Sequence, residues 1–197
     1  MKDSRTETEL VEAARQDETE AFEELVNRNA GKIYNLCYRY SGREDEARDL
    51  TQETFVRAFK AVKKFHGDAG FSSWLYRIAS NIWFDRAKRR KKVTFVSMDM
   101  PVRQDDGETE RQFRDGGATP EQDYEKKEMD GKVQEALCLL AGDQRTAIIL
   151  KYIEGKSLEE IASICGCSFG TASSRISRGL KELRKHLKGY LPRENGT

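Results

Sequence analysis

The stretch SSWLYRIASNIWFDRAKRRKK, residues 72–92, decides how this chain folds. Successive residues of a helix are rotated by about 100°, and at that angle the apolar side chains of the stretch gather on one side. They are Trp74, Leu75, Ile78, Ala79 and Ile82. Cationic, amide and aromatic side chains gather on the other side, and they are Arg77, Asn81, Phe84 and Lys88. The stretch therefore predicts a helix with one face in a core and the other in solvent.

The polar face has the composition that an exposed nucleic-acid strand requires. Phosphates attract positive charge, and unstacked bases stack on flat apolar side chains. Nearly every residue from 86 to 92 is basic. The face predicts binding of single-stranded DNA, and the alternative is a core helix with a solvated basic end.

The rest of the composition favours an all-α protein with two small helical domains. Hydrophobic residues make up 37% of the 197 residues and charged residues 35%, with only three prolines and little strand-like alternation. Residues 96–118 show no periodicity and are rich in Asp, Glu, Arg, Gln and Gly, which predicts a flexible acidic linker. We therefore expect one domain over residues 1–95 and a second over 119–197.

The net charge of +1 conceals an uneven distribution of charge. The N-terminal 30 residues and residues 104–130 are acidic, whereas basic side chains gather at 86–92 and 175–188. This pattern predicts two separate nucleic-acid contacts, with one contact and one solvated basic face as the alternative.

The chain contains no apolar run long enough to span a membrane and no apolar signal core at its acidic N-terminus, so we expect a cytoplasmic protein without membrane insertion. The four cysteines are Cys37, Cys138, Cys165 and Cys167. None has partners at zinc-ligand spacing. We expect free thiols, no metal and no cofactor.

The N-terminal part predicts one or two helices over residues 6–40, followed by a helix that runs to about residue 65. Ser41-Gly-Arg-Glu44 has the spacing of a capping box at the start of that helix. Its predicted apolar side consists of Leu50, Phe55, Ala58, Phe59 and Val62. A loop with two glycines, residues 65–71, separates it from the basic helix.

The C-terminal part has the pattern of a helix-turn-helix. Ser157-Leu-Glu-Glu160 predicts a capping box for a short helix over 158–164, and residues 166–168 predict a tight turn. A last helix over 169–187 follows, with a basic outer face. Such a second helix enters the major groove of duplex DNA. The alternative is an ordinary pair of packed helices in which the basic side of the second helix is simply exposed to solvent.

Four strings in this order resemble the extracytoplasmic-function group of bacterial sigma factors. They are DLTQETF (49–55), FSSWLYRIASN (71–81), SLEEIA (157–162) and GTASSR (170–175). The resemblance implies two domains, known as regions 2 and 4, and a function as the promoter-specificity subunit of RNA polymerase. It covers nearly the whole chain except the linker and the ends.

The resemblance implies three sets of binding residues. One mixed polar face would bind the β′ clamp helices of core RNA polymerase, through Asp49, Gln52, Glu53, Val56 and Lys60. The loop and the basic helix would melt and read the −10 element, through His66, Gly67, Asp68, Phe71, Arg77, Asn81, Phe84, Lys88, Arg89 and Arg90. The last helix would read −35 duplex, through Thr171, Ser173, Ser174, Arg175, Ser177, Arg178, Lys181 and Lys185.

Within the −10 set, the resemblance implies a flipped base in a pocket formed by the loop and the helix. Asn81 would pair with the base edge, Phe71 would supply a stacking or wall surface, and Arg77 with the residues 88–90 would hold phosphates. In the −35 set, this chain departs from the common pattern, because Ser168, Ala172 and Ser173 stand where many members have Pro, Val and a basic residue. The −35 sequence preference therefore does not carry over.

The resemblance also implies contact with the β flap, an anti-sigma factor as partner, and a linker that threads towards the RNA exit path; a solvated tether is the alternative for the linker. No nucleophile–base pair, phosphate loop or metal cluster emerges, so we expect no enzymatic activity. Two other classes remain open: a dimeric DNA-binding regulator that uses the helix-turn-helix alone, and a DNA-processing enzyme.

Overall fold

The computed structural model describes residues 3–67, 70–94 and 120–190, with the backbone alone for 90–94 and 120–127. The predicted linker, residues 96–118, lies outside this range. The described elements are all helical: α1 (Glu7–Arg15), α2 (Thr19–Ser41), α3 (Glu44–Ala61), the 3-10 turn η1 (Val62–Lys64), α4 (Phe71–Thr94), α5 (Pro120–Leu139), α6 (Gly142–Ile148), the π-helical turn η2 (Ile149–Ile153), α7 (Leu158–Cys165) and α8 (Phe169–Leu187). The predicted all-α class is confirmed.

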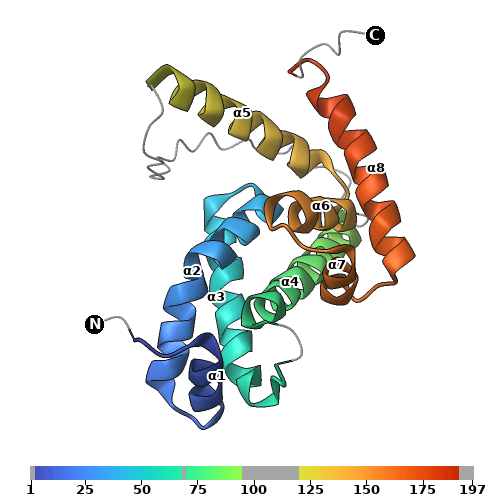
Figure 1. Cartoon of the computed structure of the whole chain (residues 1–197). Coiled ribbons are helices and arrows are strands. Elements are labelled where there is room, and N and C mark those ends of the chain that lie inside the picture. Colours follow the sequence, from blue (N-terminus) through green and yellow to red (C-terminus); the bar gives the residue numbers. More distant parts are fainter. Residues whose placement is uncertain (1–2, 68–69, 95–119, 191–197) are drawn as a thin grey trace.

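Helix α4 lies in the middle of the molecule (Figure 1). It packs against α2 and α3 on one side and against α6 and α7 on the other. Apolar side chains from both halves, among them Leu36, Leu75 and Leu150, belong to one connected core. The two halves therefore pack together in this structure, a question that the sequence left open.

Several predicted helix boundaries are confirmed by their caps. Ser157 accepts a hydrogen bond from the Glu160 backbone N–H at 3.1 Å, and Glu160 accepts one from the Ser157 backbone N–H at 2.8 Å, which completes the predicted capping box. Ser168 caps α8 by accepting from the backbone N–H of Thr171. These side chains satisfy N–H groups that have no partner within their own helix.

The capping box predicted at Ser41–Glu44 is wrong. Ser41 is the last residue of α2, and its hydroxyl donates to the carbonyl oxygens of Cys37 and Arg43. Arg43 is the N-cap of α3, without a side-chain cap. Gly42 ends α2 in a left-handed conformation, with φ +75°, and a Cβ there would lie 2.6 Å from the Cys138 sulfur. The chain turns at this glycine, so Ser41 belongs to the helix before the turn.

Two residues predicted on apolar faces are exposed. Phe59 is 53% exposed although its ring contacts Phe22 at a centroid distance of 5.1 Å. Ile153 is also exposed, although its spacing from Ala147, Ile148 and Leu150 predicts one shared apolar side for these four residues. It lies at the end of η2, and because a π-helical turn holds one more residue than an α-helical turn, it rotates the following side chains away from the expected face.

Candidate nucleic-acid interface

The outer face of α4 carries most of the polar residues that the sequence assigned to it. The exposed ones are Arg77, Asn81, Lys88 and Arg89. The opposite side is buried, with Leu75, Ala79 and Ile82 in the core. Arg86, which the sequence analysis did not single out, turns towards α3 and pairs with Glu53 at 2.6 Å. The result is an exposed strip of cations and one amide, which also includes the exposed carboxylate of Asp85, on a helix whose opposite side is packed in the core.

The loop before α4 is anchored by three aromatic rings. The Phe65 and Phe71 rings meet edge to face with centroids 5.8 Å apart, and Trp74 lies 4.9 Å from Phe65 and 5.5 Å from Phe71. His66 and Gly67 are exposed beside this cluster, and Gly67 has φ +83°, a conformation that favours glycine. Asp68 and the side chain of Arg90 lie outside the described residues.

Two aromatic residues predicted for the DNA face are more enclosed than the sequence indicated. Phe71 is 1% exposed, so in this structure its ring supports the loop and presents no open face for stacking. Phe84 is half-buried and packs against the core. Trp74, expected in the core, is half-buried as the third member of the ring cluster.

The C-terminal helices form the predicted helix-turn-helix. Gly166 ends α7 in the left-handed region with φ +59°, and α8 begins three residues later. Burial raises the pKa of the Cys165 thiol to about 11, so this cysteine at the turn stays protonated at neutral pH. The turn leaves one side of α8 packed on α5, α6 and α7, and the other side open.

The open side of α8 carries five of the eight residues that the sequence assigned to duplex binding: Ser173, Ser177, Arg178, Lys181 and Lys185. The other three are half-buried. Arg175 pairs with Asp143 of α6 at 3.2 Å, and Ser174 donates to the carbonyl oxygen of Thr171 at 3.0 Å. Phe169 is 54% exposed at the start of α8, which the sequence did not indicate, because an aromatic residue at a helix start resembles a core anchor.

The predicted polar face of α3 is exposed at Asp49, Gln52, Val56 and Lys60. Glu53 is the exception, since it bridges Arg57 at 2.5 Å and Arg86 of α4 at 2.6 Å. Partial desolvation pushes the pKa of Glu53 upward, but the hydrogen bonds from Arg86 and Arg57 outweigh this and lower it. Glu53 therefore ties α3 to α4.

Phe59 adds an exposed apolar side chain to this face of α3, where the sequence predicted only Val56. Val56 is 46% exposed, and Phe59 lies three residues later, so the two are neighbours on one helical face. The only signal in the sequence was the width of the apolar set on this helix, which exceeds what one buried stripe needs.

Both halves of the chain match models of known protein families. Residues 25–93 match the family model of sigma-70 region 2, and residues 130–183 match that of sigma-70 region 4. The ECF RNA polymerase sigma factor SigW of Bacillus subtilis is 36% identical over 179 residues, which cover 90% of this chain and 95% of SigW. The chain belongs to the extracytoplasmic-function sigma factors.

Other relatives agree with this assignment. The ECF RNA polymerase sigma factor SigE of Mycolicibacterium smegmatis is 37% identical over 167 residues, covering 85% of this chain and 62% of SigE. The sigma factor RpoE of Bartonella quintana, solved in complex with the anti-sigma factor NepR, has a TM-score of 0.65 and 26% identity, covering 86% of this chain and 98% of RpoE. As a family member, this sigma factor acts in promoter-specific initiation of transcription with RNA polymerase.

In this sigma factor, region 4 docks on the buried side of α4 through polar contacts. The Tyr76 hydroxyl donates to Glu154 at 2.5 Å, and the Lys156 ammonium donates to the Ser73 hydroxyl at 3.1 Å. Burial, followed by the hydrogen bond to Glu154, raises the pKa of Tyr76.

Within the described residues, no helix is both long and apolar enough to cross a membrane.

Arg145 of α6 is a further buried docking group. Its guanidinium donates to the carbonyl oxygens of Tyr40 in α2 and of Cys138 in α5, and it lies 5.4 Å from the centre of the Trp83 ring. A buried arginine on carbonyl oxygens fixes the orientation of the groups that it joins, because each of its N–H donors points in a set direction. The docking leaves the outer faces of both α4 and α8 exposed.

Proposed function

We propose that this sigma factor melts the −10 promoter element with the loop 65–71 and α4, and reads −35 duplex with α8. We assign the first activity to a domain of residues 1–95 and the second to residues 119–197, joined by the linker 96–118. One observation carries the proposal: the exposed face of α4 presents Arg77, Asn81 and Lys88 on a helix whose first turn is fixed by an aromatic cluster. Promoter opening would need no covalent chemistry by this chain.

The α4 face suits a displaced single strand. Extruding a base from duplex DNA costs a few kcal/mol, which contacts to the flipped base and to phosphates must offset. Asn81 supplies both a donor and acceptors for a base edge. Arg77, Lys88 and Arg89 supply positive charge for phosphates, and the ring cluster supports the ends of the loop from the core side.

The open face of α8 suits duplex DNA. Arg178 and the serines 173 and 177 have the side chains that reach base edges in a major groove, and Lys181 and Lys185 follow on the same helix to contact phosphates. Arg175 ties α8 to α6 through Asp143, and Ser174 donates within α8 to Thr171 in this structure.

Core polymerase binding is proposed for the exposed face of α3, with the β′ clamp helices as partner, and for region 4 with the β flap. Asp49, Gln52 and Lys60 supply polar groups there, and Val56 with Phe59 supplies the apolar area that interface centres contain. An anti-sigma factor is a further proposed partner, because the similar RpoE was solved bound to NepR.

Run-off transcription with purified core polymerase tests the function as a whole. Adding this chain should confer initiation at specific promoters, whereas the free chain should bind the same DNA weakly. No promoter-dependent initiation on any genomic template would contradict the proposal. Specific promoter binding by the free chain, without polymerase, would favour a DNA-binding regulator instead.

Two variants test the assignment of sites. Asn81→Ala should impair open-complex formation in a way that depends on the −10 sequence, with core binding unchanged. Asn27→Ala, which removes an exposed amide of α2, is the matched control. Replacing Asp49, Gln52 and Glu53 together should weaken core binding. If Asn81→Ala opens every −10 variant as the unaltered protein does, the pocket assignment is wrong.

A further inference from the structure

We propose that Glu7, near the start of α1, is a positioning residue for promoter melting: it holds the first turn of α4 and with it the end of the loop 65–71. This inference rests on the proposed function of that loop. Glu7 lies outside residues 25–93, the part of the chain that matches the region 2 model.

The start of α4 has no cap of its own. The residue before it is Gly70, whose carbonyl accepts from the Trp74 backbone N–H at 3.1 Å but which has no side chain to accept from the first N–H groups. Those groups have no partner inside the helix. The Glu7 carboxylate fills this role from 64 residues away, accepting from the Phe71 backbone N–H at 3.2 Å. Its negative charge also suits the positive end of the helix dipole.

A second anchor holds the next residue of α4. The Ser72 hydroxyl donates to the side-chain oxygen of Asn29 at 2.9 Å. Asn29 is only 2% exposed, and its own amide donates to the Leu25 carbonyl at 2.8 Å, so α2 fixes its direction. Consecutive residues of α4 are thus held by α1 and by α2.

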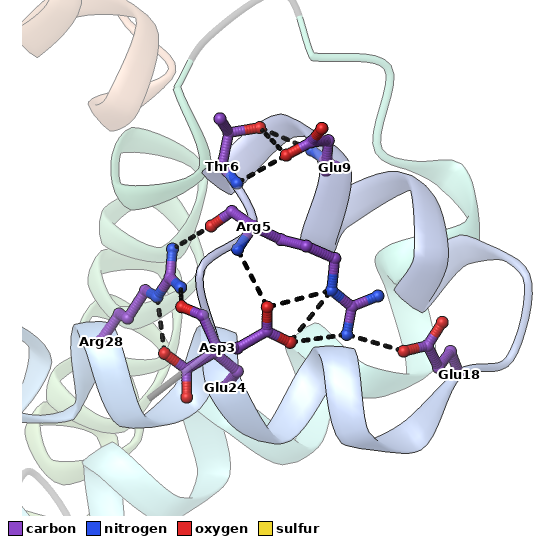
Figure 2. A network of polar contacts seen from close by, with 7 residues as sticks. All are labelled: Asp3, Arg5, Thr6, Glu9, Glu18, Glu24 and Arg28. Atoms are coloured by element: carbon purple, nitrogen blue, oxygen red, sulfur yellow. Dashed lines mark hydrogen bonds and ion pairs between the residues drawn. The ribbon is translucent and has the colours of Figure 1, made fainter. Parts of the chain in front are cut away.

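Glu7 can act as an anchor because the chain that carries it is itself fastened to α2 (Figure 2). The Arg28 guanidinium donates to the carbonyl oxygens of Asp3 and Arg5 at 2.6 and 2.8 Å, and it pairs with Glu24 at 2.8 Å. Arg5 in turn pairs with Asp3 and with Glu18, each at 2.7 Å. The hydrogen bonds from Arg5 lower the pKa of Asp3 to about 2, so this network keeps its charges at neutral pH.

Helix α1 then begins immediately after this fastened segment. Thr6 and Glu9 form a capping box, with the Thr6 backbone N–H donating to Glu9 at 2.7 Å. Glu7 therefore lies on an ordered first turn, and its hydrogen bond reaches Phe71, whose buried ring packs on Phe65 at the other end of the loop. Loss of this hydrogen bond would let the first turn of α4 fray and would displace Phe71 beneath the loop.

The test compares three variants in the holoenzyme: Glu7→Ala, Glu7→Gln and the control Glu12→Ala. Glu12 is on the same helix and pairs with Arg15, so its loss changes the charge of α1 equally without touching α4. The probe is promoter duplex with 2-aminopurine in the −10 element, whose fluorescence reports melting. Glu7→Ala should slow melting roughly fivefold, the factor expected for a lost helix cap. Glu7→Gln should melt within about twofold of the unaltered protein, because its amide oxygen still accepts from Phe71.

A second readout separates positioning from a general loss of folded protein. Melting rates are compared on templates with single base changes in the −10 element. A displaced loop should reduce the ratio of the melting rate on the best template to the melting rates on its variants. A smaller folded fraction would lower all of these rates by the same factor. Affinity for core polymerase should be the same for all three variants.

Three results would overturn the inference. They are equal melting by Glu7→Ala and Glu12→Ala, faster melting by both Glu7 variants, which would indicate that Glu7 acts by repelling DNA, and an unchanged ratio between templates. If the unaltered holoenzyme melts no −10 element at all, the proposed function fails, and the inference fails with it. If the unaltered holoenzyme melts DNA and Glu7→Ala matches it, only the inference about Glu7 fails.

Discussion

Helices α4 and α8 both present a basic outer face, but the molecule holds them differently. Helix α4 is enclosed by α2, α3, α6 and α7, and its first turn is pinned by α1. Helix α8 packs on α5, α6 and α7 and stands at the edge of the molecule (Figure 1). The difference fits the proposed tasks. A flipped base requires groups fixed around one pocket, whereas reading a duplex requires a helix that protrudes into a groove about 12 Å wide.

The largest expected difference between the two helices is in the free energy of unfolding. Leu75→Ala in α4 should lower it by about 3 kcal/mol, because a fully buried leucine leaves a cavity among well-packed neighbours. Leu180→Ala in α8 should lower it by only about 1 kcal/mol, because that side chain is partly exposed. Urea denaturation at 25 °C measures both, and equal losses would contradict the view that α4 is the more enclosed helix.

The close contact of α8 with α6 at Gly179 should show the next largest effect. A Cβ at Gly179 would lie 2.8 Å from Ile148 of α6, so Gly179→Ala should cost about 2 kcal/mol of unfolding free energy. Gly170→Ala is the control in the same helix, where a Cβ meets nothing within 4 Å, and it should stabilise by about 0.5 kcal/mol. Thermal unfolding of the two variants in parallel distinguishes them; similar melting temperatures would mean that α6 and α8 are not in close contact in solution.

The hydrogen bond between Tyr76 of α4 and Glu154 of region 4 can be removed by deleting a single oxygen atom. Tyr76→Phe removes the hydrogen bond to Glu154 and should weaken the docking of the two regions by about 1 kcal/mol. The separation between dyes on the two regions, measured by fluorescence energy transfer, should increase. Tyr152→Phe is the control, because Tyr152 is exposed. An unchanged separation in Tyr76→Phe would show that the apolar core alone holds region 4 in place.

The same tyrosine predicts a pH dependence of docking. The pKa of Tyr76 is raised above the ordinary value of 10 by burial and by Glu154, so the docked state favours the protonated form. The contribution of the Tyr76 hydroxyl to the free energy of docking is complete below about pH 10. It is lost as the pH rises towards the raised pKa. Energy transfer recorded from pH 8 to pH 11 should fall at the upper end, and Tyr76→Phe should flatten that part of the curve.

The smallest expected effects are in DNA affinity. Arg77→Ala should weaken binding of the holoenzyme to single-stranded −10 DNA several-fold and reduce its salt dependence by roughly 0.7 in log–log slope. Arg178→Ala should weaken binding to −35 duplex and reduce that slope by roughly 0.9. Binding titrations at several salt concentrations measure both. Each variant is the control for the other, and a loss shared by both substrates would mean that the two faces are not specialised.

Much of the local structure was predictable from the sequence. The spacing of apolar residues predicted α4 and α8, and Ser157 with Glu160 predicted the start of α7, because these patterns depend on residues within one or two turns of each other. Predictions that depended on where a helix lies in the fold were less successful. Phe59 was assigned to the apolar side of α3 with Leu50, but nine residues at about 100° each put the two on opposite sides of the helix, and Phe59 is 53% exposed.

The residues of the candidate site also fall into two groups: those whose exposure was predictable from the sequence and those whose contacts depend on the fold. The exposed positions of Arg77, Asn81 and Arg178 follow from helical angle alone. The enclosure of Phe71 and the pairing of Arg175 with Asp143 do not, because each depends on a neighbouring element far along the chain or across the turn. The roles of Glu7 and Glu53 were invisible for the same reason: their partners, Phe71 and Arg86, lie in another helix.

The sequence by itself determined the helices, the cap of α7, the two basic faces and the family, since these depend on short-range periodicity, hydrogen-bonding side chains and motif order. The tertiary structure decided which faces are covered. It docked region 4 on α4 through Tyr76 and Arg145 and fastened the start of α4 to α1. Such contacts depend on how whole helices pack in three dimensions. From the sequence alone, a glutamate or a tyrosine can equally well be a solvated side chain or an anchor between helices.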